Sequence, residues 1–219
     1  MTILVFQHVR NEPLGLFETL FTEKSIPVEH VYLYDTNEVP LRSKATHLVF
    51  LGGPMSVNDE HEFPWLAQEK ELIRRSVKAK KKVLGLCLGA QLIASAYDAK
   101  VYKYITETGW RHLQGTPGSC FPERFPAFQL HGETFEIPYN GRLLATGAEV
   151  HNQAFSYKTA LGLQFHLELN EEIIKDWCKC LRRSDQETIL RETPRYLSES
   201  NRLCRKVADR FLSDATFYP

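Results

Sequence analysis

Residues 83–92 read Val-Leu-Gly-Leu-Cys-Leu-Gly-Ala-Gln-Leu, an apolar run in which one cysteine stands between two glycines. Gly85 and Gly89 each lie two positions from Cys87, which is the spacing of a nucleophile elbow, where a buried strand turns sharply into a helix. Glycines suit both flanks because strand and helix approach too closely there for a Cβ atom. The stretch therefore predicts Cys87 as a nucleophile, although a cysteine among apolar residues is often an inert core thiol.

A second stretch supplies a candidate base. Residues 162–168 alternate like a strand, so His166 and Glu168 are expected to point to the same face. A histidine with its own orienting carboxylate completes a Cys-His-Glu triad. The expected helix start at Cys87 also favours the thiolate that attacks.

A third feature is the loop Gly52-Gly53-Pro54, which follows a buried apolar run. A glycine-lined loop in this place can direct a backbone N–H at a tetrahedral oxyanion, beside the N–H of Leu88 just after the nucleophile. Nucleophile, base and loop therefore indicate one site for acyl transfer.

The chain as a whole alternates strand-like and helical patterns, which is typical of an α/β fold with a mostly parallel central sheet and helices on both faces. Strands are expected at residues 3–7, 28–34, 46–51, 83–86 and 162–168. Helices are expected at residues 14–24, 64–80, 89–97, 170–183 and 185–211. The turn-rich region 100–157 predicts a small antiparallel β decoration, with short strands at residues 128–130, 134–137 and 142–145. We expect a single domain, with a catalytic part over residues 1–183 and a helical extension over residues 184–219.

Composition narrows the choice of partners and compartment. Lys plus Arg and Asp plus Glu are equal at 27 each, so no nucleic-acid or membrane partner is expected. The five cysteines show neither paired C-x-x-C spacing nor a nearby histidine array, so we expect no metal site and no cofactor. This cysteine usage fits a reduced, cytoplasmic compartment, and no stretch approaches transmembrane length.

The motifs together resemble those of the class I, triad-type glutamine amidotransferases, and most closely the stand-alone GMP-synthase-like members. The matching segments are residues 51–57 (LGGPMSV), 85–91 (GLCLGAQ), 108–110 (TGW), 131–135 (HGETF), 151–155 (HNQAF) and 162–168 (GLQFHLE). They fall within residues 46–168, and their order and separation are highly specific. The resemblance implies a flavodoxin-like fold with a nucleophile elbow.

The resemblance also implies a reaction. Cys87 would attack the side-chain amide of glutamine, form a γ-glutamyl thioester and release ammonia, and hydrolysis would then give glutamate. His166 would shuttle protons while Glu168 orients it. Gly53 and Leu88 would form the oxyanion hole, and Gln91 would help to hold the substrate amino acid.

The residues themselves do not choose glutamine, because a thiol triad is equally able to cleave a γ-glutamyl peptide or conjugate. A catalytically idle regulatory module on the same fold is a third reading, which the presence of all three triad side chains weakens. Four further polar residues either line the pocket mouth or are ordinary turn and surface residues. They are His131, His151, Asn152 and Gln153.

A partner is the last expectation. The residues after 183 are too few for an ATP-using synthetase domain, and the sequence has no P-loop. If ammonia is passed on, we therefore expect its acceptor on a separate synthetase subunit, and otherwise a free-standing hydrolase of glutamine or another γ-glutamyl amide.

Overall fold

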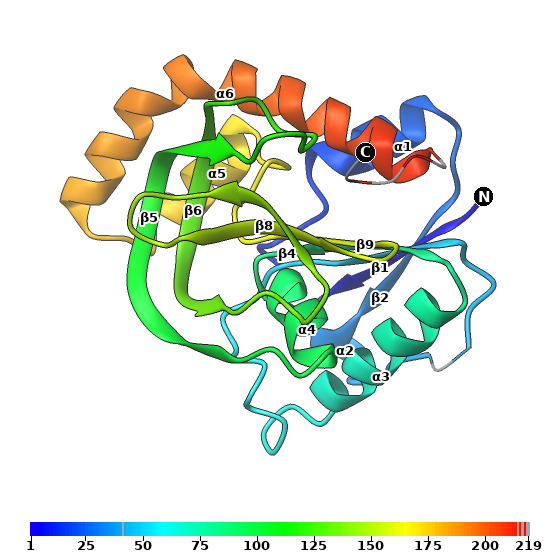
Figure 1. Cartoon of the computed structure of the whole chain (residues 1–219). Helices are drawn as coiled ribbons and strands as arrows, with labels where there is room; N and C mark the ends of the chain where they lie inside the picture. The colour runs from blue at the N-terminus through cyan, green and yellow to red at the C-terminus, as the bar shows by residue number, and fades with distance from the viewer. Residues whose placement is uncertain (41, 214, 216, 218–219) are drawn as a thin grey trace.

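The parallel half of the central sheet carries the predicted elbow. In the computed structural model, which describes residues 1–40, 42–213, 215 and 217, its strand order is β2-β1-β3-β4-β9 (Figure 1). These strands are β1 (Ile3–Gln7), β2 (Val28–Tyr32), β3 (His47–Phe50), β4 (Lys82–Leu86) and β9 (Ala160–Leu163). All four pairings within this half are parallel, which confirms the predicted sheet.

An antiparallel extension continues the sheet in the order β9-β8-β7-β5-β6. Its strands are β5 (Val101–Gly115), β6 (Phe125–Phe135), β7 (Arg142–Thr146) and β8 (Asn152–Tyr157). The extension is larger than the small decoration expected from the sequence. The strand expected at residues 128–130 and the first two residues of the one expected at 134–137 belong to the single strand β6, which ends at Phe135, and β5 and β8 were not predicted.

The reason for this error lies in the glycines of the extension. Gly109 and Gly132 were read as turn punctuation, but they lie inside β5 and β6. Gly109 has φ +84°, a conformation that favours glycine, so it marks an irregularity within a continuous strand rather than its end.

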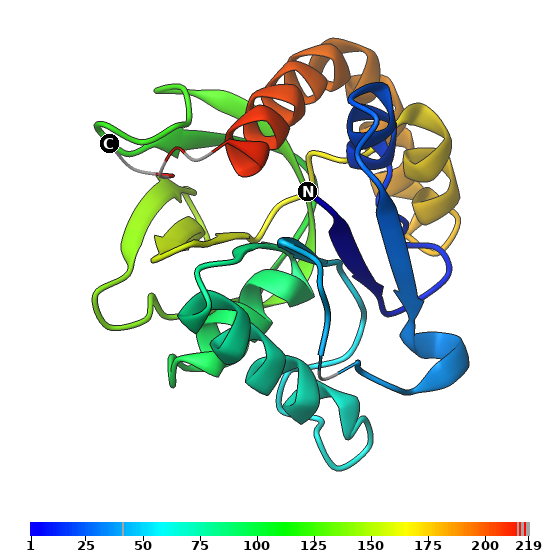
Figure 2. The same cartoon turned by 90° about the vertical axis from the view of Figure 1, so that its right-hand side faces the viewer.

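Helices cover both faces of the sheet (Figure 2). One face packs against α1 (Leu16–Glu23) and α6 (Arg183–Leu212), with α5 (Glu171–Cys178) beside α6. The other face packs against α3 (Trp65–Lys78) and α4 (Leu88–Ala96). Successive side chains along a strand point to opposite faces of the sheet, and both faces are buried. Leu4 therefore packs in the apolar core on one face and Val5 in the apolar core on the other.

One strand prediction and one helix prediction need correction. The expected strand 28–34 ends at Tyr32, because the short helix α2 (Leu33–Thr36) begins there. The expected helix 170–183 ends at Cys178, and a turn precedes the long helix α6.

Among the helices within the described residues, none combines the length and apolar character that a bilayer crossing requires.

Candidate active site

Cys87 lies at the turn from β4 into α4, where the backbone is strained. It has φ 50° and ψ −105°, which L residues rarely adopt. A Cβ atom on Gly85 would collide with the backbone of Gly89, and one on Gly89 would collide with the carbonyl oxygen of Phe50. Both glycines are therefore required by close packing, as the elbow motif predicts, and they hold Cys87 at the N-terminus of α4.

His166 and Glu168 come from the segment after β9, which is not a strand as expected. β9 ends at Leu163, and His166 makes only an isolated bridge, through its N–H to the carbonyl oxygen of Phe128 at 2.9 Å. The carbonyl oxygen of Glu168 accepts a hydrogen bond from the N–H of Leu16 at 2.7 Å. The segment leaves β4 to bridge β6 and the start of α1, so the expected continuation of the strand over residues 164–168 is wrong.

The two side chains nevertheless pair. His166 Nδ1 lies 2.6 Å from Glu168 Oε1, and both side chains are buried. The His166 ring packs edge-on against Trp177 at 4.8 Å between ring centroids and lies close enough to Cys87 to interact with it. Burial lowers the pKa of His166, but the charge of Glu168, its hydrogen bond to the ring and the nearby Cys87 outweigh burial and raise this pKa well above its usual value. This arrangement favours the imidazolium form of His166.

The sulfur of Cys87 opens into a cavity of about 640 Å³. Of the residues proposed for the site, the cavity lining includes Cys87, Gly53, Gln91 and His131. Other lining residues are Pro54, Met55, Ser56, Asp59, Lys103, Tyr104, Thr106, Leu130, Gly132 and Glu133. The structure thus brings the predicted loop, elbow and His131 together around one space.

Gln91 is buried beside the cavity and is held from two sides. Its Nε2 donates to the carbonyl oxygen of Glu133 and to Gln164 Oε1, both at 3.3 Å. Gln164 in turn places its Nε2 3.7 Å from the sulfur of Cys87. Gln164, which the sequence analysis did not single out, is therefore a direct neighbour of the sulfur.

A buried polar network extends inward from the cavity. His131, which lines the cavity, and Gln153, which does not, both belong to this network. The carboxylate oxygen Oε2 of Glu107 lies 3.1 Å from His131 Nε2 and 2.8 Å from Gln153 Nε2. Gln153 Oε1 accepts from Gln129 Nε2 at 2.9 Å. Gln153 is therefore placed one layer behind His131 and does not line the cavity.

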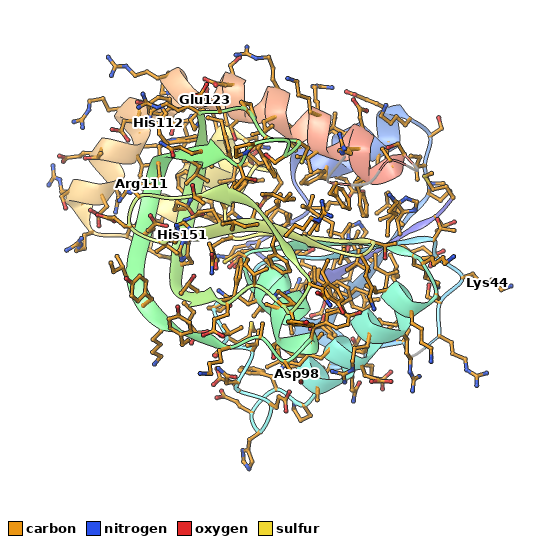
Figure 3. The ribbon with its side chains drawn as sticks, viewed as in Figure 1. Lys44, Asp98, Arg111, His112, Glu123 and His151 are labelled. Atoms are coloured by element: carbon orange, nitrogen blue, oxygen red, sulfur yellow. The ribbon has the colours of Figure 1, made fainter. Side chains whose placement is uncertain are left out.

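The other two polar candidates also lie away from the cavity lining. Asn152 Nδ2 donates to the carbonyl oxygen of Phe135 at 2.8 Å, and His151 is exposed in the turn between β7 and β8 (Figure 3). On β5, Arg111 and His112 are exposed as well, and His112 packs edge-on against Tyr196 of α6 (Figure 3).

A backbone hydrogen bond links the Gly53 loop to the start of α4. The N–H of Gly89 donates to the carbonyl oxygen of Leu51 at 3.1 Å. Within the part of the chain that the structure describes, the N–H groups of Gly53 and Leu88 donate to no other protein atom. Two unpaired donors beside a nucleophile are what an oxyanion hole needs.

Three ionisable residues near this loop were missed by the sequence analysis, of which two are buried and Glu12 is partly buried. His8 lies between the carbonyl oxygen of Gly52 and the carboxylate of Glu69. Glu12 has a carboxylate against Gly52, and burial raises its pKa although the charges of His166 and His8 lower it. None of the three belongs to a recognisable motif; His8, directly after the apolar strand β1, is the one whose position in the sequence gave a signal.

A larger surface groove of about 1110 Å³ lies beyond the ends of β1 and β2 and is lined by residues such as Arg10, Glu18 and Lys175. Cys87 is absent from the lining of this groove, whereas it lines the cavity of about 640 Å³. The described residues also hold no group of three or more His, Cys, Asp or Glu side chains placed to bind a metal ion. The cavity at Cys87 is therefore the candidate active site.

Known proteins place this chain in a family. The family model described as Glutamine amidotransferase class-I matches residues 20–174, so the chain belongs to the class I glutamine amidotransferases. A crystal structure of a glutamine amidotransferase from Thermotoga maritima superimposes with a TM-score of 0.90 at 29% identity, covering 98% of this chain and 99% of that one. The family resemblance and the α/β fold inferred from the sequence are thereby confirmed.

Two curated relatives differ in their names. One, named as a subunit of the glutamine-hydrolysing GMP synthase of Methanocaldococcus jannaschii, is 30% identical over 129 residues, which span 53% of this chain and 69% of the relative. Gamma-glutamyl peptidase 4 of Arabidopsis thaliana is 32% identical over 127 residues, which span 51% of this chain and 50% of the relative. The matching region thus covers only part of either relative.

Proposed function

We propose that this chain hydrolyses a γ-glutamyl amide, with glutamine as its first candidate substrate, through a thioester on Cys87. The observation that carries the proposal is the strained Cys87, which lines a cavity of about 640 Å³ and lies beside a His166 whose Nδ1 is 2.6 Å from Glu168 Oε1. A thiol that lines a cavity, with a buried base and its orienting carboxylate beside it, supplies the parts that nucleophilic amide cleavage requires.

The proposed reaction has two halves, formation and hydrolysis of the thioester, and Cys87 and His166 act in each. The sulfur of Cys87, its proton taken by His166, attacks the amide carbon, and the N–H groups of Gly53 and Leu88 bind the oxyanion. The intermediate collapses as His166 gives its proton to the leaving nitrogen, which departs as ammonia. A water that transfers a proton to His166 then attacks the thioester, and the proton returns to the sulfur as glutamate leaves.

The cavity lining supports an amino-acid substrate. It carries Lys103 together with Asp59 and Glu133, so both signs of charge are available for an α-carboxylate and an α-ammonium group. Glu133 Oε2 is buried without a hydrogen-bond partner among the described residues. We assign Glu133 to the substrate ammonium, and Glu133→Gln is expected to raise KM more than it lowers kcat.

A γ-glutamyl peptide is the second candidate substrate. The relative named gamma-glutamyl peptidase supports it. So does the cavity volume of about 640 Å³, which lies within the range of sites that hold drug-sized ligands and so leaves room beyond one amino acid. In this case the leaving group is an amino acid or peptide amine in place of ammonia.

Product release distinguishes these substrates. Glutamate and ammonia are measured from glutamine, and glutamate from a panel of γ-glutamyl dipeptides, with asparagine and α-glutamyl dipeptides as controls. Asparagine is one methylene shorter, so it is expected to react about 10- to 200-fold more slowly. Absence of turnover on every γ-glutamyl amide would favour the idle regulatory module.

A separate synthetase subunit remains a proposal, which the archaeal relative supports because its name describes one subunit of a synthase. Given ATP and candidate amino acceptors, this chain alone is expected to release ammonia without consuming ATP. Glutamine-dependent amidation that consumes ATP stoichiometrically would contradict this assignment.

A further inference from the structure

A buried histidine lies directly behind the loop that carries Gly53. His8 follows β1, is 1% exposed, and has its Nδ1 3.0 Å from the carbonyl oxygen of Gly52. Its Nε2 lies 3.1 and 3.2 Å from the two carboxylate oxygens of Glu69 in α3. Neither His8 nor Glu69 lines the cavity, so an effect of either residue on the reaction passes through the loop.

The proton on Nδ1 of His8 follows from its surroundings. A carbonyl oxygen only accepts hydrogen bonds, so Nδ1 carries a hydrogen. On the other side of the ring, Nε2 and the carboxylate of Glu69 share a second proton. Nδ1 donates to the oxygen of Gly52 whichever of these two groups holds that proton. The ring is also stacked on Trp65 at 5.3 Å between centroids, which fixes its orientation.

Holding one side of a peptide group decides where its other side points. In a trans peptide the C=O of Gly52 and the N–H of Gly53 point in opposite directions. With the oxygen of Gly52 held toward His8, the N–H of Gly53 points away from His8, and Gly53 lies on the cavity lining with Cys87. Two consecutive glycines have the backbone freedom to rotate this peptide if nothing holds it.

We propose that His8, anchored by Glu69, is a positioning residue that holds the Gly52–Gly53 peptide with its N–H directed at the oxyanion, so that the oxyanion hole is formed before substrate or partner binds. The inference rests on the proposed hydrolysis. It predicts a chain whose hydrolytic activity needs no activating protein, because the donor is already in place.

A matched pair of substitutions tests the hydrogen bond. His8→Leu and His8→Asn have similar shapes, but only asparagine can donate an N–H to the oxygen of Gly52. His8→Leu is expected to lower kcat about 10²- to 10³-fold, which is the usual cost of one oxyanion donor, with little change in KM. His8→Asn is expected to retain kcat within about tenfold of the wild type, since it keeps the donor but loses the link to Glu69.

Alkylation of Cys87 by iodoacetamide provides the control. This substitution reaction forms no tetrahedral oxyanion, so its rate reports the thiolate and its accessibility without the oxyanion hole. Both variants are expected to alkylate at the wild-type rate, measured by mass spectrometry, and to keep the near-ultraviolet circular dichroism of the folded protein.

The outcomes separate the inference from the proposed function. If the wild type cleaves γ-glutamyl p-nitroanilide and a folded His8→Leu does so equally fast, the positioning role is overturned and the hydrolysis stands. If His8→Leu does not fold, His8→Asn decides alone, and a loss of about 100-fold or more in a folded His8→Asn with normal alkylation overturns the role. If the wild type alkylates normally but cleaves no γ-glutamyl amide alone, both the ready oxyanion hole and the proposed hydrolysis are rejected.

Discussion

The two halves of the candidate site are held in different ways. Cys87 is fixed by its backbone, because Gly85 and Gly89 leave no space for a Cβ atom and φ at Cys87 is 50°. His166 and Glu168 lie in a segment without positive φ, held by hydrogen bonds and by Trp177. The nucleophile thus depends on main-chain packing, whereas the base depends on side-chain contacts.

The largest expected effect is at the nucleophile. Cys87→Ala is expected to lower kcat for γ-glutamyl amide hydrolysis by about 10⁴-fold or more, because no thioester forms without the sulfur. Cys120→Ala and Cys178→Ala are the matched controls, since neither thiol lines the cavity, and both should retain near-normal rates. Loss of activity in either control but not in Cys87→Ala would assign the nucleophile elsewhere.

The base is expected to matter nearly as much. His166→Ala should lower kcat/KM by about 10³-fold or more, because in the proposed reaction His166 both takes the thiol proton and protonates the leaving nitrogen. His30 offers a control because its Nε2 lies 3.0 Å from Glu18 Oε2, outside the cavity. Near-normal rates for His166→Ala across the pH range would reject its role.

A smaller effect is expected at the orienting carboxylate, with a defined shift in pH dependence. Glu168→Gln should lower kcat about 10- to 10³-fold, since an amide can still accept from Nδ1. The charge of Glu168 raises the pKa of His166, so its removal lowers that pKa. Because the active form keeps a proton on His166, the basic limb of the kcat/KM profile should move to lower pH, and a shift to higher pH would contradict the pairing.

A stability effect tests the packing of the elbow. Gly89→Ala is expected to reduce the free energy of unfolding by about 2 to 3 kcal/mol, because its Cβ collides with the backbone of Phe50. Gly132→Ala is the control, where the added Cβ meets only the hydroxyl of Thr106 at 3.3 Å. Urea unfolding measures both, and equal losses would show that the elbow glycine has no special role in packing.

The same contrast explains what could be predicted from sequence. The elbow was predictable because close packing requires glycine at two fixed positions, each two residues from Cys87. Strands β1, β3 and β4 were predictable because each is a short and largely apolar run, whereas β2 carries Glu29 and His30. The His166 segment was only half predictable, since a two-residue alternation identified the pair but not that the chain leaves β9 at Leu163.

The polar residues around the cavity show the limit more clearly. Asn152 and Gln153 stand in a matching motif, yet one bonds the backbone of Phe135 and the other joins Glu107 behind the wall. Conversely, Glu12 and Glu69 gave no signal, because their contacts with Gly52 and His8 depend on three-dimensional proximity. Sequence spacing reports local geometry, whereas these contacts join residues far apart in the chain.

The smallest expected effect compares the two halves directly. At Cys87 glycine should relieve strain that alanine keeps, because only a residue without Cβ adopts φ 50° and ψ −105° freely. Cys87→Gly is therefore expected to be about 1 kcal/mol more stable than Cys87→Ala, although both are inactive. At His166, where φ is not positive, glycine should be less stable than alanine by up to about 1 kcal/mol, because it gains freedom in the unfolded chain. Urea unfolding of the four variants measures the two differences, and a Cys87→Gly variant no more stable than Cys87→Ala would show that the backbone at Cys87 is not strained.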